Sequence, residues 1–568
     1  GNITLGDSLN PREPNIGMYT REKIIPQELP YILENKGNIK VGKNGIGIYG
    51  KNFSNGDSAT LPNSTIEVGE NGIGVYTESG NGNLESGSIK AGKDGVGVYI
   101  AGNGGTIRAT NTFNMTLGDG SSGNNKGTFG FVNVGTNNVI HSDISNVTLQ
   151  NNSVYIYSTD TSGTSANPQI TNNTNITATG NNNYGLYSAG YVVNNANMNL
   201  AAGTGNIGVY SIKAGTIENR NGVITVGGSV PGEDEYGIGM AAINGASISN
   251  DRDIYVSGHL SIGMYGDDRG TTLRNSGNIY LDPSSATATD KIQTMMGVFV
   301  NNGAKFVNTG NITTVGSYHG NNNVQGLVGV AVMNGSTLKN YGNIDIDANE
   351  SFGVVVRNSV IKNYGNFKIK VRGKGTYGVS YKDISAADLT ALQAIVNSKL
   401  TSDPTGQELA AAGGVNKSYE GVSITIQNGK PIFTRNGVTV SDDEVEKIEK
   451  IIGEATSNLG MSDVGFYIDT LGRTKPIDIN GATPPINSQL IVGTEYSELT
   501  NKKEWFVKDD VIAPFLQQIQ GRNFKLTSIA GSLTWMATPV LDNYGQIKGV
   551  AMTKLPYTAF VEKSHNAW

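Results

Sequence analysis

The sequence contains no cysteine in 568 residues. Disulfide frameworks, cysteine zinc sites and thiol catalysis are therefore excluded. A cytosolic chain of this length usually carries a few cysteines. A chain that crosses a second membrane unfolded gains from having none, because a disulfide formed on the way would block its passage. We therefore expect a secreted protein.

Charge and long apolar runs are also scarce. Only 16% of the residues are charged and the net charge is −6, which gives no attraction towards nucleic acid. No run of 18 apolar residues predicts a transmembrane helix, and no signal peptide or initiator methionine is present. The opening residues Gly1–Leu5 resemble half of a repeat cut in mid-coil, so we expect the sequence to be a piece of a longer protein.

Glycine, at 77 residues, has about twice its usual share, and together with asparagine it marks a repeat. The first half of the repeat reads N-x-G-N-apolar-x-apolar, as in 340–346. The second half places a glycine between apolar residues and commonly ends in tyrosine. Copies of the first half begin at Asn35, Asn275, Asn308, Asn340 and Asn363, and degenerate copies begin at Asn194 and Asn250. Copies of the second half begin at Ile16, Ile46, Ile73, Val96, Tyr184, Ile207, Ile262, Met296 and Phe352. A third, shorter element precedes many first halves, as in 245–250, 303–308 and 335–340.

Each unit therefore reads as three short strands that alternate apolar and polar residues, separated by asparagine and glycine turns. One unit cannot bury its apolar face alone, so neighbouring units must stack. The sequence predicts an all-β, right-handed parallel β-helix solenoid of about fourteen coils, each adding about 4.8 Å. The variable step between units disfavours a left-handed hexapeptide helix. Asparagine before glycine suits left-handed backbone positions at the coil corners, and inward-facing asparagines can stack from coil to coil.

Three parts follow from the pattern. Residues 1–381 are the predicted parallel β-helix. Residues 382–460 are a predicted small α+β insertion, with helices in 386–400 and 441–459 and strands between them. Residues 461–568 are the predicted closing coils and C-terminal cap, in which 464–467 returns to the coil motif and 542–550 recovers the first repeat half.

The two repeat halves, in an asparagine- and glycine-rich chain without cysteine, resemble the large autotransporter adhesins of fusobacteria. These are type V secretion passengers, and they include the galactose-sensitive and arginine-inhibitable outer-membrane adhesins. The tail, 553–568, looks like the stretch that leads into the membrane barrel of this family. The resemblance implies display on the bacterial surface, attachment to a host receptor or glycan, and coaggregation with partner bacteria. It implies a monomeric passenger joined to its own C-terminal barrel, and it transfers no ligand residues.

Catalytic and metal sites are not expected, and neither is a cofactor. Pectinases use the β-helix scaffold, and Asp267 and Asp268 near His259 superficially resemble a polygalacturonase site. The histidine precedes the paired aspartates, however, which is the reverse of that family's order, and the remaining partners are missing. The alternative interpretation is that Asp267 and Asp268 lie in a polar turn without a catalytic role. The acidic run 233–235 lacks calcium-loop spacing and reads as a solvated loop. No histidine spacing fits a metal.

A column of tyrosines is one candidate binding surface. Strict alternation would put Ile46 and Ile48 on one face of a strand, and Gly47 and Tyr49 on the other. With the isoleucines inward, the tyrosines form an outward ladder whose rings could stack on sugars or on partner side chains. The alternative is a structural ladder partly covered by neighbouring loops. The members of this ladder are Tyr49, Tyr76, Tyr99, Tyr187, Tyr210 and Tyr265.

The inserted segment is the second candidate, because it interrupts an otherwise continuous scaffold. Its predicted partner-binding residues are Tyr419, Lys430, Arg435 and Lys447. The alternative is a structural appendage that aids folding during export. For the whole chain three hypotheses stay open: an adhesive portion, a structural stalk that displays a distal binding tip and templates folding, and a glycan-cleaving enzyme.

Overall fold

The computed structural model describes most of the repeat region and parts of the remainder. The described residues are 1–20, 32–57, 63–78, 80–123, 126–230, 235–285, 292–293, 295–318, 321, 323–349, 351–357, 360–363, 369–372, 422–428, 430–435, 437–443, 445, 463–472, 487–521, 525–531 and 535–554. Among them, no helix is both long and apolar enough to cross a membrane. The predicted helices in 386–400 and, apart from its first residues, 441–459 lie outside this part of the chain.

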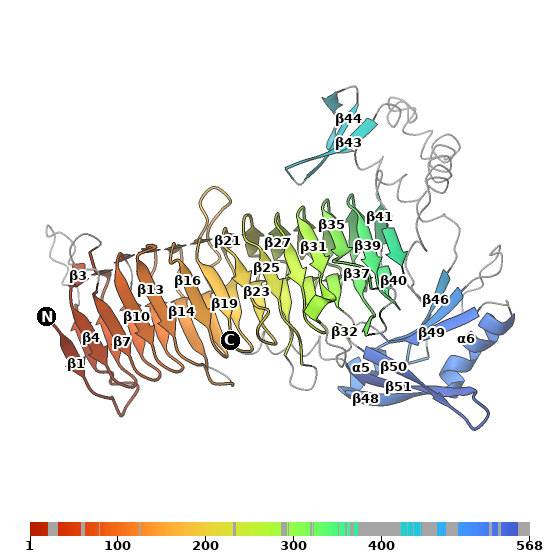
Figure 1. Cartoon of the computed structure of the whole chain (residues 1–568), viewed down its shortest axis with the longest axis horizontal. Helices are drawn as coiled ribbons and strands as arrows, with labels where there is room; N and C mark the ends of the chain where they lie inside the picture. Colours follow the sequence, from red (N-terminus) through yellow and green to blue (C-terminus); the bar gives the residue numbers. More distant parts are fainter. Residues whose placement is uncertain are drawn as a thin grey trace.

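The repeat region is a right-handed parallel β-helix, as predicted (Figure 1). Every complete coil contributes one strand to each of three faces, and, with one interruption on the first face, each strand pairs in parallel with the equivalent strand of the next coil. Thirteen complete coils and the first strand of a fourteenth are described, in agreement with the predicted number. At about 4.8 Å a step, the rod is about 60 Å long.

The strands of the first sheet carry the N-x-G-N-apolar half of the repeat, and this sheet is interrupted between β13 and β16. Its strands are β1 (Ile3–Leu5), β4 (Asn38–Val41), β7 (Thr65–Val68), β10 (Gly87–Ala91), β13 (Phe113–Leu117), β16 (Asn146–Leu149), β19 (Asn175–Ala178), β22 (Met198–Asn199), β25 (Ile224–Val226), β28 (Ile254–Val256), β31 (Asn278–Leu281), β35 (Asn311–Thr314), β39 (Ile344–Asp347) and β42 (Ile369–Arg372).

The strands of the second sheet carry the glycine-centred half. They are β2 (Ile16–Tyr19), β5 (Ile46–Tyr49), β8 (Ile73–Thr77), β11 (Val96–Ile100), β14 (Thr128–Asn133), β17 (Ser153–Ser158), β20 (Tyr184–Ser188), β23 (Ile207–Ser211), β26 (Ile238–Ala242), β29 (Ile262–Gly266), β33 (Met296–Val300), β37 (Val328–Met333) and β40 (Phe352–Arg357).

The third sheet carries the short third element, and most of its strands end in asparagine. They are β3 (Ile32–Asn35), β6 (Asn52–Asn55), β9 (Asn81–Leu84), β12 (Thr106–Ala109), β15 (Val139–Ser142), β18 (Ile170–Asn172), β21 (Tyr191–Asn194), β24 (Thr216–Asn219), β27 (Ser247–Asn250), β30 (Thr272–Asn275), β34 (Lys305–Asn308), β38 (Thr337–Asn340) and β41 (Val360–Asn363). Beside the rod, η2 (Pro283–Ser285) is a single 3₁₀ turn, and the short β32 (Ile292–Gln293) pairs with β36 (Val324–Gln325).

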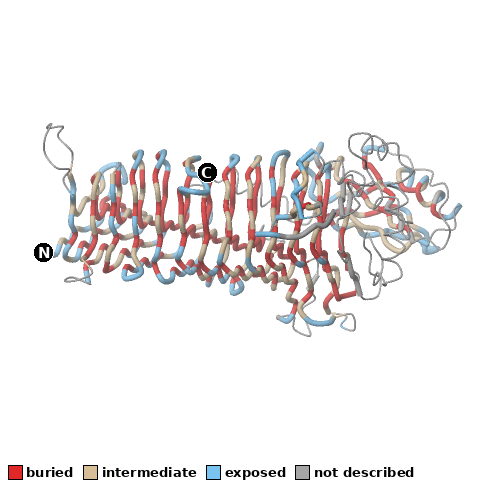
Figure 2. Tube along the Cα trace, turned by 90° about the horizontal axis from the view of Figure 1, so that it is seen from above, coloured by how far each residue is buried: buried red, intermediate tan, exposed pale blue. Residues whose placement is uncertain are grey.

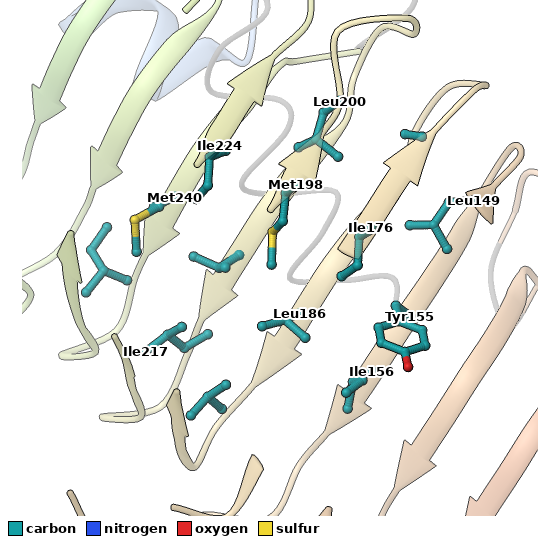
Figure 3. Packing of buried hydrophobic residues seen from close by; sticks show 14 of the residues in the cluster. Leu149, Tyr155, Ile156, Ile176, Leu186, Met198, Leu200, Ile217, Ile224 and Met240 are labelled. Carbon is teal, nitrogen blue, oxygen red and sulfur yellow. The ribbon is translucent and has the colours of Figure 1, made fainter. Parts of the chain in front are cut away.

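The core is one continuous column of aliphatic side chains along the rod axis. Figure 2 shows buried residues along the whole length of the solenoid, and Figure 3 shows Ile176 and Met198 of the first sheet and Leu186 of the second sheet pointing into the same core. Most described strands of the first sheet alternate buried and more exposed residues, as β16 does with Val147 and Leu149 buried. Each coil therefore covers the apolar surface of its neighbour, which is the stacking that the repeat predicts.

Asparagines form an internal ladder at the ends of the third-sheet strands, which confirms the prediction of coil-to-coil stacking. The side chain of Asn275 is fully buried, accepts from Asn250 Nδ2 at 2.9 Å and donates to Asn308 Oδ1 at 3.0 Å. Other steps of the ladder join Asn35 to Asn55, Asn172 to Asn194, Asn194 to Asn219, Asn219 to Asn250, and Asn308 to Asn340. Asparagine before glycine also adopts the expected left-handed conformation, as at Asn244 (φ 54°) before Gly245 (φ 76°).

The described part of the insertion is a small antiparallel sheet. It comprises β43 (Val422–Gln427), β44 (Lys430–Arg435) and β45 (Val438–Thr439), with turns at the two Asn-Gly pairs as predicted. Asn428 (φ 49°) and Gly437 (φ 80°) supply the left-handed positions of these turns.

The C-terminal unit has its own core. One sheet is parallel and comprises β46 (Asp463–Ile468), β47 (Asn487–Val492) and β49 (Lys525–Ala530). The other is antiparallel and comprises β48 (Glu504–Lys508), β51 (Ile547–Lys554) and β50 (Trp535–Leu541). The helices are α5 (Glu495–Thr500) and α6 (Asp509–Gly521). Phe466, Phe515 and Trp535 are buried between these elements.

Two sequence expectations are wrong in this unit. The segment 464–467 has the spacing of a coil strand, but within the described residues β46 pairs with β47 and not with a strand of the solenoid sheets, because Phe466 and Ile468 pack into the separate core. The segment 542–550 is a β-hairpin and not a repeat half. The Asp542 carboxylate accepts from the backbone N–H groups of Tyr544 and Gln546, and Gly545 (φ 76°) completes the tight turn. Figures 1 and 2 show the unit beyond the last coils; that it seals the core there stays a prediction.

Candidate functional site

The glycine of the second-sheet repeat breaks the alternation of its strand. Register pairs Ile46 with Ile73 and Ile48 with Val75, and the intervening glycines are not paired. A Cβ on Gly47 would lie 2.5 Å from both Gly74 O and Ile66 Cγ2, so this position faces the interior and only a glycine fits it.

As a consequence the two apolar residues that flank each glycine point to opposite sides. In β23, Val209 lies in the axial core, whereas Ile207 lies with Tyr210 in a second cluster on the outer face. The expectation that Ile46 and Ile48 share one face is therefore wrong. Ile48 lies inside the rod. Ile46 is in register with Ile73, which is in register with Val96, so Ile46 belongs to the outer column beside the tyrosines.

The six predicted tyrosines do share one outward column, in two runs. In the first run the ring centroids of Tyr49 and Tyr76 are 4.8 Å apart with planes 4° from parallel, and Tyr76 and Tyr99 follow at 5.2 Å. In the second run Tyr187 and Tyr210 are 5.0 Å apart. Tyr265 is in register with them but is separated from Tyr210 by Ala241.

Further members of the column escaped the sequence reasoning. Tyr19 precedes Tyr49 at 5.4 Å, Tyr157 precedes Tyr187 at 5.0 Å, and Phe299 packs edge-on against Tyr265 at 5.4 Å. The overlooked signal for the whole outer face is the apolar residue immediately before each glycine, which alternation assigned to the core.

Ring stacking limits what the column can bind. Where neighbouring rings are parallel and about 5 Å apart, each ring covers the face of the next, and only their edges point outward. Sugars stack on aromatic faces, so the interior of the column is poorly suited to glycan stacking. Tyr19, at 54% exposed, is the ring at the open end of the first run.

Exposure changes sharply along the column. Tyr49, Tyr76 and Tyr99 are half-buried, but Tyr187, Tyr210 and Tyr265 are at most 3% exposed. From β14 to β37 the outer face forms one buried apolar cluster, which we call the outer cluster. Its buried members are Phe129, Val132, Val154, Tyr157, Tyr187, Ala189, Ile207, Tyr210, Ile212, Tyr236, Ile238, Ala241, Ile243, Leu260, Ile262, Tyr265, Met296, Phe299, Val328, Ala331 and Met333.

Three phenols of the column, those of Tyr49, Tyr157 and Tyr187, are held in the neutral form. The Tyr49 hydroxyl donates to Glu78 Oε1 at 2.6 Å, and this hydrogen bond, with burial, raises the pKa of Tyr49 to about 12. Burial raises the pKa of Tyr157 to about 12 and that of Tyr187 further. These groups can donate hydrogen bonds, but they supply neither a nucleophile nor a general base at neutral pH.

The paired aspartates hold a turn together. Asp267 accepts from the Tyr265 hydroxyl at 2.7 Å and from Asn302 Nδ2 at 2.8 Å, and burial raises its pKa. Asp268 (φ 78°) accepts the backbone N–H of Asn244 at 3.3 Å. His259 lies before β29, where its carbonyl accepts the N–H of Ser229. Among the described residues, no three histidine or acidic side chains gather as a metal site would require.

The predicted residues of the insertion are only partly described. Lys430 is exposed at the start of β44, and Arg435 is the last residue of that strand. The register pairs them with Gln427 and Val422, at opposite ends of the hairpin, so the structure does not bring the two basic residues together. Tyr419 and Lys447 lie outside the described residues.

The hairpin contacts the solenoid through an aromatic pair. Phe433 of β44 is 3% exposed, and its ring meets that of Tyr341 edge-on, with centroids 6.3 Å apart. Tyr341 lies in the turn between β38 and β39, that is, within the repeat unit itself. The insertion is therefore in contact with the scaffold that it interrupts.

With this geometry established, the chain can be compared with known proteins. Residues 54–311 match the family model of the BigA third pectate lyase-like domain. The match begins in β6, ends in β35, and covers less than half of the 568 residues. No curated protein and no solved structure matches the chain. The similarity to this BigA domain agrees with the pectate lyase-like β-helix and points to a bacterial surface protein of the adhesin type.

Proposed function

We propose that the chain is the rod-shaped part of a secreted adhesin passenger, which attaches a bacterium to host cells and to partner bacteria through non-covalent surface recognition. The observation that carries this proposal is the match to the BigA third pectate lyase-like domain over a continuous run of coils. An unbroken rod places a binding surface at a distance from its anchor, and the loops between its strands are surface segments that can carry binding residues.

The finer parts of the proposal rest on the sequence. Repeat halves such as 340–346 and 352–355 resemble those of fusobacterial type V autotransporter adhesins, which implies export through a barrel in the outer membrane, a monomeric passenger and coaggregation. The absence of cysteine in the full sequence supports passage through the periplasm in an unfolded form.

We propose recognition without chemistry. Both aspartates of the pectinase-like sequence motif are engaged in a turn, where Asp267 accepts from Tyr265 and Asn302 and Asp268 accepts from Asn244. A glycan-cleaving site needs two carboxylates free to flank a sugar bond, or a carboxylate-bound calcium with a base.

A structural stalk is the second candidate. In the aromatic column the faces of the stacked rings contact one another. Most of the outer face of the second sheet is also buried. A large part of this face therefore stabilises the rod and is not available for binding. In that case the recognition surface lies on a distal part of the passenger, and the rod sets its reach.

The test is binding of the purified, labelled chain to cultured host cells and to partner bacteria. We expect saturable binding by the chain itself. The first variant lacks 382–460, and the matched control carries Asn221→Ala on an exposed turn of the rod. Binding lost only in the deletion variant assigns recognition to the insertion, and binding retained assigns it to the rod. Binding by the full passenger but not by this chain supports the stalk. Release of new sugar ends from a polysaccharide panel would contradict recognition without chemistry.

A further inference from the structure

One face of the antiparallel sheet in the C-terminal unit is open to solvent and carries large apolar side chains. In β48 the side chains of Trp505 and Val507 pack with the core of the unit, which α6 covers. Phe506, between them, points the other way and is 48% exposed. Seven of the twelve exposed large apolar side chains in the described part of the chain belong to this unit, although the rod is much larger. Such a concentration marks an interaction surface.

The register of the three strands defines this surface, which we call the open face. It consists of three rows across the sheet, which are Glu504, Thr553 and Met536; Phe506, Ala551 and Thr538; and Lys508, Gly549 and Val540. Met536 is 51% exposed and Val540 is 38% exposed. Gly549 is covered by the ring of Phe506, with which a Cβ at this position would collide. The open face is therefore a nearly flat apolar centre with one charged residue at each end of β48.

The two charges of the open face are opposite in sign and symmetrically placed. Glu504 and Lys508 are both exposed, and Phe506 lies midway between them. A two-fold axis that crosses the strands at Phe506 reverses the strand direction and keeps the strand order. Each Glu504 then faces Lys508 of a second copy. At the centre Phe506 meets its counterpart, and Met536 faces Val540, so the surface is complementary to itself in charge and in side-chain size.

Two other modes of association suit this sheet less well. The edge strand β50 contains Pro539, which has no backbone N–H, and a proline in an edge strand disfavours the addition of a further strand. The open face carries one positive and one negative charge, and not the excess of basic residues that an anionic lipid surface attracts. A second copy of the chain satisfies both charges.

We propose that two folded copies of the chain pair through the open face, related by this two-fold axis. The two sheets lie about 10 Å apart, and Phe506, Met536 and Val540 are removed from water. Three strands from each copy make a small interface, so the pair is weak and forms where the local concentration of the chain is high. Each copy still folds as a single chain, and the pairing does not depend on what the rod binds.

Charge reversal at the two ends of β48 tests the arrangement. The mass of the full chain is followed by sedimentation equilibrium at increasing protein concentration. Glu504→Lys and Lys508→Glu each create two like-charge contacts in the pair, so each variant alone should associate about tenfold or more weakly than the unmodified chain. An equimolar mixture of the two variants should recover the association, because it restores both opposite-charge contacts. Lys525→Glu, at an exposed position of β49 in the other sheet, is the matched control and should leave the association unchanged.

The circular dichroism spectrum of each variant should match that of the unmodified chain, so that changes in mass report pairing and not unfolding. A chain that stays monomeric up to about 1 mM, or an association that both charge reversals leave unchanged, would overturn the proposal. A mixture of the two variants that associates no better than either alone would overturn it as well. Binding to vesicles of neutral or anionic phospholipid, without association between copies, would assign the open face to a lipid surface and refute the pairing.

Discussion

Removing one member of the asparagine ladder is the sharpest test of what holds the coils together. Asn275 is fully buried, and its amide joins three coils: it accepts from Asn250 Nδ2, and it donates to Asn308 Oδ1 and to the carbonyl of Gly277. Asn275→Ala leaves the Asn250 amide and the Asn308 carbonyl without their ladder partner. At about 1–3 kcal/mol for each buried polar group, we expect a loss of about 2–6 kcal/mol.

Two further variants serve as controls for the stability loss expected of Asn275→Ala. Asn221→Ala removes an exposed bond to Asn195 and should cost less than about 0.5 kcal/mol. Asn35→Ala removes the first described member of the ladder, where only Asn55 loses a ladder partner, so its cost should fall between the other two. Stacked coils need not unfold in one step, so urea denaturation should be accompanied by hydrogen exchange of the amides in β27, β30 and β34. An Asn275→Ala variant as stable as Asn221→Ala would refute the reasoning.

Native interruptions of the ladder support the same logic. Register places Leu84 and Ala109 at consecutive ladder positions, and Asn55 turns its amide to the carbonyls of Ser64 and Ser86 instead. When two neighbouring asparagines of the ladder are both replaced by apolar residues, no buried amide between them loses its hydrogen-bond partner. Replacement of one asparagine alone leaves its neighbours' buried amides unpaired, and therefore costs more stability.

Three further predictions concern the glycine column, the tyrosines and the insertion. Gly297→Ala should lower the free energy of unfolding by about 1–3 kcal/mol in urea denaturation, because its Cβ would lie 2.5 Å from Gly329 O, whereas Gly6→Ala, with open space around it, should be neutral. Tyr49→Phe should remove a phenol that titrates near pH 12 in absorbance titrations. Its pKa is raised on folding, so its stabilising contribution is complete below pH 10 and is lost between about pH 10 and 12. Phe433→Ala should accelerate limited proteolysis within 422–440, because the hairpin loses its aromatic contact with the rod; an unchanged cleavage rate would show that the contact does not hold it.

Most of the solenoid was predictable because its determinants are local and repeated. An asparagine at the end of a strand can satisfy its amide only by meeting its counterpart one coil away, so the pattern at Asn275 and Asn308 implied both the stacking and the ladder. The same holds for the Asn-Gly corners such as Asn244.

The faces of the second sheet were not predictable from alternation. A glycine such as Gly47 lets the backbone approach the next coil so closely that the strand shifts by one residue, and the apolar residue before it turns outward. The hairpin at Asp542 illustrates a second limit. A turn stabilised by an aspartate and a glycine has nearly the same composition as a repeat half, and only the pairing of β50 with β51 distinguishes them.

The direction of the hydrogen bonds has a mechanical consequence. In the solenoid they run along the rod axis, so tension between its ends loads the coil interfaces in series, and the weakest interface yields first. The coil from Asn275 to Asn308 spans 33 residues and occupies about 4.8 Å of the rod, but it would extend to about 110 Å once peeled away. Tension between the two ends of the rod would thus be relieved one coil at a time, while the neighbouring coils stay wound.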